Sequence, residues 1–82
     1  MKARVVIRNK SGVFDPEGKV VEGGLHRLGY ASVEQVRVGK VVDIELGGTR
    51  DEATDQIHRM CRQFLVNPVI EDYSIEWLDE GP

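Results

Sequence analysis

The stretch GVFDPEGKVVEGGLHRLGY, residues 12–30, contains a strand exit, a capped helix and a helix stop. Asp15, Pro16 and Glu17 supply a side-chain acceptor, a residue without an N–H and a carboxylate, all of which suit the first turn of a helix. One side of a 3.6-residue period then carries the apolar residues Val20, Val21, Leu25 and Leu28. Gly29 suits the left-handed position just after a helix. We therefore predict that a helix begins at Asp15 and stops at Gly29.

Two adjacent glycines, Gly23 and Gly24, interrupt this predicted helix. Each costs about 0.8 to 1 kcal/mol relative to alanine unless another group passes close to it. We therefore expect a close-packing site at these two positions.

Strand patterns flank the helix on both sides. Residues 3–7 alternate apolar and polar side chains, residues 32–38 are rich in valine, and residues 41–46 resume an apolar alternation. Gly39-Lys40 separates the last two segments, and a two-residue turn with glycine first suits a type II′ hairpin. We predict that residues 32–38 and 41–46 pair as antiparallel strands.

A second helix and a last strand complete the chain. Thr49 and Glu52 form a capping box, and Asn67-Pro68 stops the helix. The apolar stripe of this helix consists of Ala53, Ile57, Met60, Cys61 and Phe64. Residues 69–78 then alternate as a strand, with Val69, Tyr73, Ile75 and Trp77 on one side, and we expect the tail 79–82 to be frayed.

The order of these elements predicts the fold class. Strand, helix, strand, strand, helix and strand form two similar halves, indicating a single α+β domain over residues 1–82 with a ferredoxin-like β-α-β-β-α-β arrangement. Both helices would pack on the same face of an antiparallel sheet. We expect a second subunit to bury the other face or an edge strand, because Arg4, Arg8, Val6 and Val36 mix charge with apolar surface.

Composition excludes several classes of protein. The 82 residues carry a net charge of −3, which gives no reason to expect nucleic acid or an anionic membrane as partner. One cysteine cannot form an internal disulfide, and this favours a reducing compartment. The sequence has no apolar run of 18 residues and enters charged, alternating sequence at once, so we expect a cytoplasmic protein without a signal peptide.

The candidate chemical motifs all favour structural roles. The loop from Gly12 to Lys19 has five residues between its glycines where the Walker pattern needs four, and Val20 stands where that pattern needs a hydroxyl. His58 and Cys61 have helical spacing for two metal ligands, but Cys61 falls on the apolar stripe. Carboxylate pairs such as Asp72 with Glu76 lie on an alternating strand and indicate a solvated face. We predict no catalytic, cofactor-binding or metal-binding residue.

Four ordered motifs resemble one known family across nearly the whole chain. They are KSGVFDPEG at 10–18, LGY at 28–30, VRVGK at 36–40 and NPVIEDY at 67–73. Together they are similar to PurS, the small accessory subunit of phosphoribosylformylglycinamidine synthase in de novo purine biosynthesis.

The resemblance implies a subunit without chemistry of its own. In that family a synthetase subunit uses ATP and magnesium to activate formylglycinamide ribonucleotide, and a glutaminase subunit releases ammonia from glutamine. The small protein, as a homodimer, bridges them so that ammonia passes between the active sites. Partner contacts are expected at loop or hairpin positions that flank the family motifs, namely Lys10, Asp15, Arg37, Lys40 and Asp72.

The alternative is an ACT-like regulatory module. Such modules share the order of strands and helices and bind a small ligand at a dimer interface. The loop after the first strand would then bind an amino acid, although Asp15-Pro16 fits that role poorly.

Overall fold

The computed structural model describes residues 1–78. Its elements are β1 (Lys2–Asn9), α1 (Pro16–Arg27), β2 (Gly39–Glu45), α2 (Arg50–Met60), the π-helical turn η1 (Cys61–Leu65) and β3 (Glu71–Trp77). The predicted frayed tail, residues 79–82, lies outside the described residues. Strands and helices therefore alternate along the chain, and the predicted α+β class is confirmed.

The three strands form one antiparallel sheet with the order β2-β1-β3. Val5, at the centre of β1, is opposite Val42 on β2 and Ile75 on β3. This is the arrangement of the first, third and fourth strands of the predicted ferredoxin-like fold. Because β1 lies between the other two strands and under α2, its alternate side chains Ala3, Val5 and Ile7 are almost fully buried.

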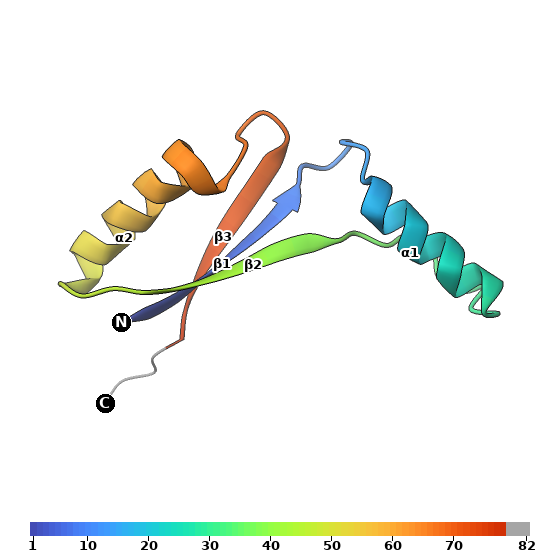
Figure 1. Ribbon diagram of the computed structural model, residues 1–82, viewed down its shortest axis with the longest axis horizontal. Helices are drawn as coiled ribbons and strands as arrows, with labels where there is room; N and C mark the ends of the chain where they lie inside the picture. Colours follow the sequence, from blue (N-terminus) through green and yellow to red (C-terminus); the bar gives the residue numbers. More distant parts are fainter. Residues whose placement is uncertain (79–82) are drawn as a thin grey trace.

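Helix α2 covers the apolar face of this sheet (Figure 1). Ile57 and Cys61 from the helical segment and Val66 from the following loop join the buried residues of β1 in one core. Around them lie the half-buried residues Val42, Ile44, Leu46, Met60, Leu65, Tyr73, Ile75 and Trp77. The predicted capping box is confirmed, because the Thr49 hydroxyl accepts from the Glu52 N–H at 3.1 Å.

Near the end of the second helical segment, one residue of the predicted apolar stripe does not face the core. Phe64, which the periodicity placed in the core, is 88% exposed. The five-residue turn η1 is wider than an α-helical turn and rotates Phe64 away from the side that carries Ile57 and Cys61. Val69 was predicted to begin the last strand, on the same side as Tyr73, but β3 begins only at Glu71 and Val69 is 78% exposed.

The opposite face of the sheet carries charged side chains beside the paired valines Val6 and Val41. Arg4 of β1 donates two hydrogen bonds to the Asp43 carboxylate on β2, at 2.9 and 3.1 Å. These two hydrogen bonds raise the pKa of Arg4 and lower the pKa of Asp43. The pair fixes charges on a solvent-exposed face and leaves the packing of the core to α2.

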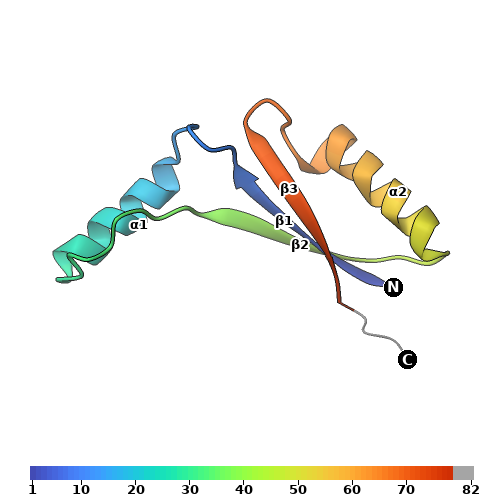
Figure 2. The same cartoon turned by 180° about the vertical axis from the view of Figure 1, so that it is seen from behind.

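Helix α1 has the predicted ends but does not pack on the sheet. Asp15 caps its start, Pro16 is its first residue, and Gly29 follows its C-cap with a φ of +102°. The helix extends away from β1 and β2, as both ribbon views show (Figures 1 and 2). The prediction that both helices cover one face of the protomer's own sheet is therefore wrong for α1.

The predicted hairpin at Gly39-Lys40 is also wrong. Residues 33–38 are extended but pair with no strand of the described chain, and β2 continues directly from them at Gly39. Gly39 does not have the positive φ that a type II′ turn requires. A Cβ on Gly39 would lie 2.6 Å from Cγ of Arg8 and from the Ile7 oxygen, so this glycine serves close packing against β1.

Gly23 and Gly24 make no close approach of the kind predicted. A Cβ on Gly23 would lie 3.5 Å from Nη1 of Arg27, and one on Gly24 would lie 3.8 Å from Nη2 of the same residue. Both are ordinary contacts with a flexible side chain. The glycine of α1 that has no space for a side chain is Gly18.

Candidate partner-binding site

The five residues predicted to contact partners lie where α1 joins the sheet. Lys10, Asp15 and Arg37 line a cavity of about 370 Å³ between the β1–α1 loop and the extended segment 33–38. Asp15 and Lys40 line a second cavity of about 300 Å³. Arg37 and Asp72 line a third of about 240 Å³. The fold thus brings the five residues to one region around three adjacent hollows.

Asp15 holds this region together through both oxygens of its carboxylate. Oδ1 accepts from the N–H of Gly18 at 3.0 Å and caps α1. Oδ2 accepts from the N–H of Val38 at 2.8 Å, which ties the helix start to the residue before β2. Hydrogen bonds from Gly18 and then Val38 lower the pKa of Asp15, so the carboxylate stays ionised at neutral pH.

Gly18 allows this connection because it has no side chain. A Cβ at this position would lie 2.3 Å from the Val36 carbonyl oxygen and 2.7 Å from Oδ2 of Asp15. The segment before β2 can therefore lie directly against the first turn of α1. This close approach holds Val36 and Val38 beside the helix instead of folding them back on β2.

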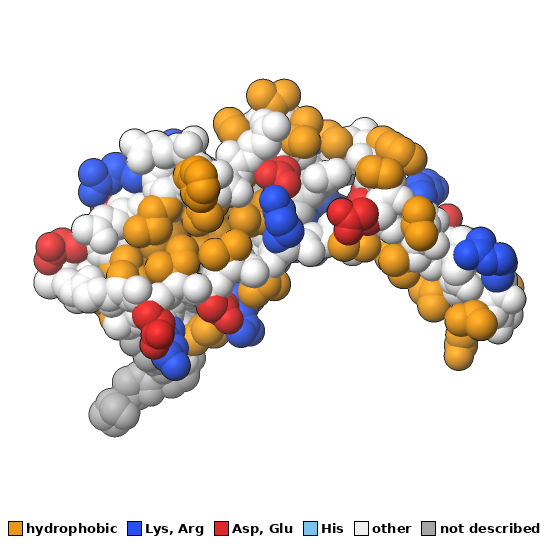
Figure 3. Space-filling view, viewed as in Figure 1, with side chains coloured by type: hydrophobic (Ala, Val, Ile, Leu, Met, Phe, Trp, Pro, Cys, Tyr) orange, Lys and Arg blue, Asp and Glu red, His pale blue; other side chains and the backbone are white. Residues whose placement is uncertain are grey.

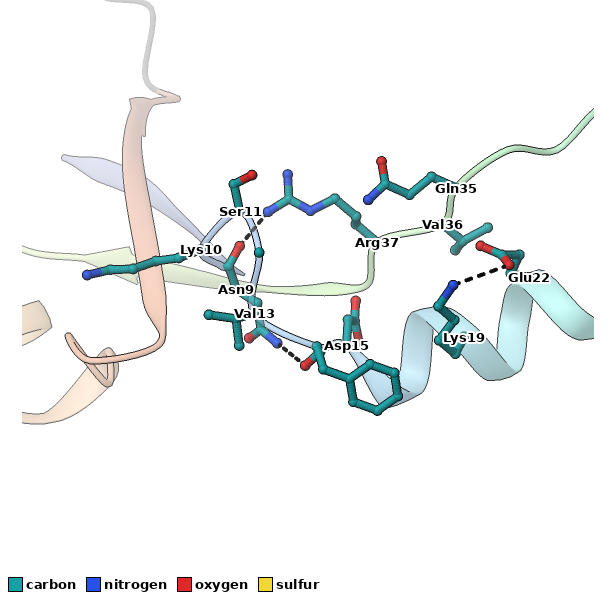
Figure 4. Close-up of a pocket in the computed structure, with 12 residues that line it drawn as sticks. Asn9, Lys10, Ser11, Val13, Asp15, Lys19, Glu22, Gln35, Val36 and Arg37 are labelled. Carbon is teal, nitrogen blue, oxygen red and sulfur yellow. Dashed lines mark hydrogen bonds and ion pairs between the residues drawn. The ribbon is translucent and has the colours of Figure 1, made fainter.

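Arg37 crosses from the extended segment to the end of β1. Its guanidinium donates to the Asn9 carbonyl, and the Asn9 side-chain amide donates to the Phe14 carbonyl at 3.3 Å (Figure 4). In the same view Lys19 pairs with Glu22 along α1. The cavity wall is thus made largely of side chains that already have partners within the chain.

The remaining predicted residues lie on the sheet side of this region. The Lys40 ammonium is 3.6 Å from a carboxylate oxygen of Glu71. The Lys10 N–H donates to the Ile70 carbonyl at 2.8 Å, and its side chain extends away from α1 in Figure 4. Asp72 is opposite Arg8 in the ladder between β1 and β3. These positions join the start of β3 to the loop before α1.

The structure exposes an apolar surface on α1, a helix that we expected to pack on the sheet. Val20 is 72% exposed and Leu28 is 75% exposed, because α1 packs on no strand. Hydrophobic side chains follow α1 to its far end in Figure 3. The exposed apolar residues of this region are Phe14, Val20, Val21, Leu28 and Tyr30. The helical periodicity located most of this surface correctly but could not show that it faces outward.

Elsewhere in the described chain, the candidate metal ligands Cys61 and His58 are packed within the fold. Cys61 is buried, and burial raises the pKa of its thiol, which disfavours the reactive thiolate. His58 is partly buried, and its Nδ1 lies 2.5 Å from the Tyr73 hydroxyl. Within residues 1–78, no three His, Cys, Asp or Glu residues group as metal ligands. None of the helices in this range combines the length and apolar character needed to cross a bilayer.

Comparison with known proteins identifies the family. The family described as PurS, phosphoribosylformylglycinamidine (FGAM) synthase, matches residues 2–79. The chain belongs to the PurS family. It is 40% identical to a PurS subunit of Methanocaldococcus jannaschii, with 92% of each chain covered. It is 44% identical to the Archaeoglobus fulgidus subunit, over 94% of this chain and 98% of that one.

Solved PurS structures share this arrangement. The M. jannaschii PurS crystal structure aligns with a TM-score of 0.83 at 37% identity, covering 92% of each chain. A Thermotoga maritima PurS structure aligns with a TM-score of 0.85 at 29% identity, over 94% of this chain and 90% of that one. A chain in the T. maritima PurLQS structure aligns with a TM-score of 0.79 at 26% identity, over 94% and 95%. The predicted ferredoxin-like fold and the predicted family are both confirmed.

Proposed function

We propose that this chain is the PurS subunit of FGAM synthase and acts in de novo purine biosynthesis in the cytoplasm. The observation that carries the proposal is the PurS family match over residues 2–79. PurS subunits with 30% to 44% identity over most of the chain support it. The same match favours this role over an ACT-like regulatory module.

Within that synthase the chain serves as a homodimeric scaffold without catalytic residues. A relative's fold occurs in the PurLQS assembly of T. maritima, which supports a place beside the synthetase and glutaminase subunits. The buried Cys61 thiol and the hydrogen-bonded His58 support a structural role for both residues. ATP and magnesium would be bound by the synthetase, and ammonia from glutamine would pass to it across an interface that this chain helps to close.

The partner surface that we propose contains Lys10, Asp15, Arg37, Lys40 and Asp72. These side chains surround adjacent hollows at the junction of α1 and the sheet. The exposed apolar residues of α1 extend from this junction along the helix and would become buried in the assembly. Charged residues around an apolar surface are the usual composition of a protein–protein interface.

Reconstitution with the two larger subunits tests the role. We expect omission of this chain to abolish most glutamine-dependent FGAM formation and to reduce turnover with added ammonium salt much less. Unchanged glutamine-dependent turnover without the chain would contradict the proposed function.

A charge reversal tests the surface. Lys10→Glu should weaken capture of the two larger subunits, whereas the matched change Arg59→Glu, on the exposed side of α2, should not. Equal effects of the two changes would show that the junction is not the contact surface.

A further inference from the structure

Two arginines without an ion-pair partner lie where β1 ends and β2 begins. Arg4, on the same side of β1 as Arg8, pairs with Asp43. Within residues 1–78, neither Arg8 nor Arg37 has a carboxylate partner of this kind. The Arg37 guanidinium donates to the Asn9 carbonyl, which leaves most of its five N–H groups available. Guanidinium groups that the fold does not neutralise attract anions.

The backbone brings these two side chains to one face of the sheet. Arg8 lies opposite Gly39 in the ladder between β1 and β2. Its stem crosses that glycine, because a Cβ on Gly39 would lie 2.6 Å from Cγ and 3.6 Å from Cδ of Arg8. Residues two apart in an extended chain share a face and are about 7 Å apart. Arg37 therefore leaves the segment before β2 on the same face as Arg8, which is the face opposite α2.

The third cavity, of about 240 Å³, receives both side chains. The hydroxyl groups of Ser11 and Ser74 line it as well, and within residues 1–78 neither has a hydrogen-bond partner. Figure 4 shows that Ser11 and Arg37 extend to the same side of the β1–α1 loop. Donors from β1, this loop, the segment before β2 and β3 thus converge on one small space.

The third cavity is positively charged although the whole chain has a net charge of −3. Its two guanidinium groups face one carboxylate, that of Asp72, so one positive charge remains. Two nearby carboxylates are already engaged. Asp15 accepts from the N–H groups of Gly18 and Val38, and Glu71 pairs with Lys40. The cavity therefore suits an anion and not a cation.

We propose that the third cavity binds the phosphate group of a small phosphorylated molecule. A phosphate group presents three oxygens in different directions, so it can accept from donors that come from four separate segments. A carboxylate has two oxygens in one plane and is satisfied by a single guanidinium. This site is separate from the loop that failed the Walker pattern, because its lining residue in the β1–α1 loop is Ser11, which precedes Gly12.

A titration of the purified chain tests for the site. Inorganic phosphate should shift the ¹H–¹⁵N signals of residues 8–11, 37 and 72–74 in a saturable way, and sodium chloride at equal ionic strength should not. Glycerol 3-phosphate should bind at least as tightly as inorganic phosphate. Sodium acetate should bind more weakly than both. No saturable shift with either phosphate compound would overturn the proposal, and so would binding of acetate as tight as that of phosphate.

The glycerol 3-phosphate arm also separates two sources of the phosphate group. A phosphorylated molecule must carry an organic part, which would extend from the open side of the third cavity. Binding of inorganic phosphate without binding of glycerol 3-phosphate would show that the cavity takes the free ion only. That result would overturn the assignment of a phosphorylated molecule.

Substitution of Arg8 tests which residues hold the phosphate group. Arg8→Gln keeps the stem over Gly39 but removes the charge, so it should raise the dissociation constant about tenfold or more. Arg37→Gln should have a similar effect. Asp72→Asn should lower the constant several-fold, because it removes the carboxylate that repels phosphate. Circular dichroism checks that each variant folds.

The matched control is Arg59→Gln on the exposed side of α2, which removes the same charge far from the third cavity. It should leave the dissociation constant unchanged. An equal loss of affinity in Arg59→Gln and Arg8→Gln would show that phosphate responds only to the overall charge of the chain. That result, or unchanged binding in Arg8→Gln, would overturn the proposed site.

This inference does not rest on the proposed function. Phosphate binding is measured with the chain alone, whereas the proposed function is measured as FGAM formation with the larger subunits. Arg8 lies outside the five proposed partner contacts, so its substitution separates the two ideas. If Arg8→Gln weakens capture of the larger subunits while the wild-type chain binds no phosphate, the cavity receives an acidic side chain of a partner, and the inference is overturned.

Discussion

The Asp15 carboxylate joins two segments far apart in the sequence, because its Oδ2 accepts from the N–H of Val38 at 2.8 Å while its Oδ1 caps α1. One side chain therefore sets where the helix begins and where the chain turns from the extended segment into β2. The Asp15 carboxylate thus connects α1 to the segment that leads into β2.

Replacing Asp15 should separate these two contacts. Asp15→Asn keeps one oxygen for the cap but offers an amide that cannot accept from Val38, so we expect a partial loss of stability. Asp15→Ala loses both acceptors and should be more destabilising, with lower helix content. Urea unfolding followed by far-ultraviolet circular dichroism measures both variants. Equal stability of the alanine variant and wild type would show that neither contact matters in solution.

Acid should destabilise the chain through Asp15 and Asp43. The folded state lowers the pKa of both carboxyl groups below the ordinary value of 3.8. The unfolded chain therefore takes up protons first as the pH falls. The two ionised carboxylates make their full contribution to the free energy of unfolding above about pH 5. That contribution is lost as the pH drops through 3.8 toward the lowered pKa values of the folded state. Thermal unfolding between pH 7 and pH 2.5 measures it.

An Asp43→Asn variant provides the comparison for that pH series. It should unfold more readily at neutral pH and show a shallower loss of stability in acid, because its titrating group is gone. Added salt should reduce the difference, since the Arg4–Asp43 pair is solvent-exposed. A variant with the same acid profile as wild type would exclude a contribution from this pair.

Two glycines of α1 should respond in opposite directions to alanine. Gly18→Ala places a Cβ 2.3 Å from the Val36 carbonyl oxygen and should destabilise the junction. Gly23→Ala meets only Nη1 of Arg27, at 3.5 Å, and should stabilise the helix by about 0.8 to 1 kcal/mol. Helix content and the urea midpoint measure both effects. A loss of stability in Gly23→Ala would indicate that another molecule packs against that turn.

The core should be sensitive at Ile57. This side chain is fully buried between α2 and the sheet, so Ile57→Ala should lower the free energy of unfolding by about 2 to 5 kcal/mol. Val69→Ala, at an exposed position, should change it by less than about 0.5 kcal/mol. Trp77 fluorescence reports the transition, because Trp77 packs against the same core. Similar losses in both variants would place the core elsewhere.

Local patterns were enough to predict both helix starts, the central strand and the family. Asp15-Pro16 and the Thr49–Glu52 box satisfy helix donors from neighbouring residues, so their effect can be read without a tertiary structure. The alternation of Ala3, Val5 and Ile7 likewise identified the side of β1 that the core buries.

Tertiary structure alone decided the position of α1 and the course of residues 32–38. Gly39-Lys40 has the composition of a turn, but Gly39 packs against β1. The Asp15–Val38 hydrogen bond and the close approach at Gly18 hold the preceding segment beside α1. Those contacts join residues far apart in the chain, so no local pattern could reveal them. The wide turn η1 rotated Phe64 out of the core for a similar reason, because periodicity assumes a regular helix.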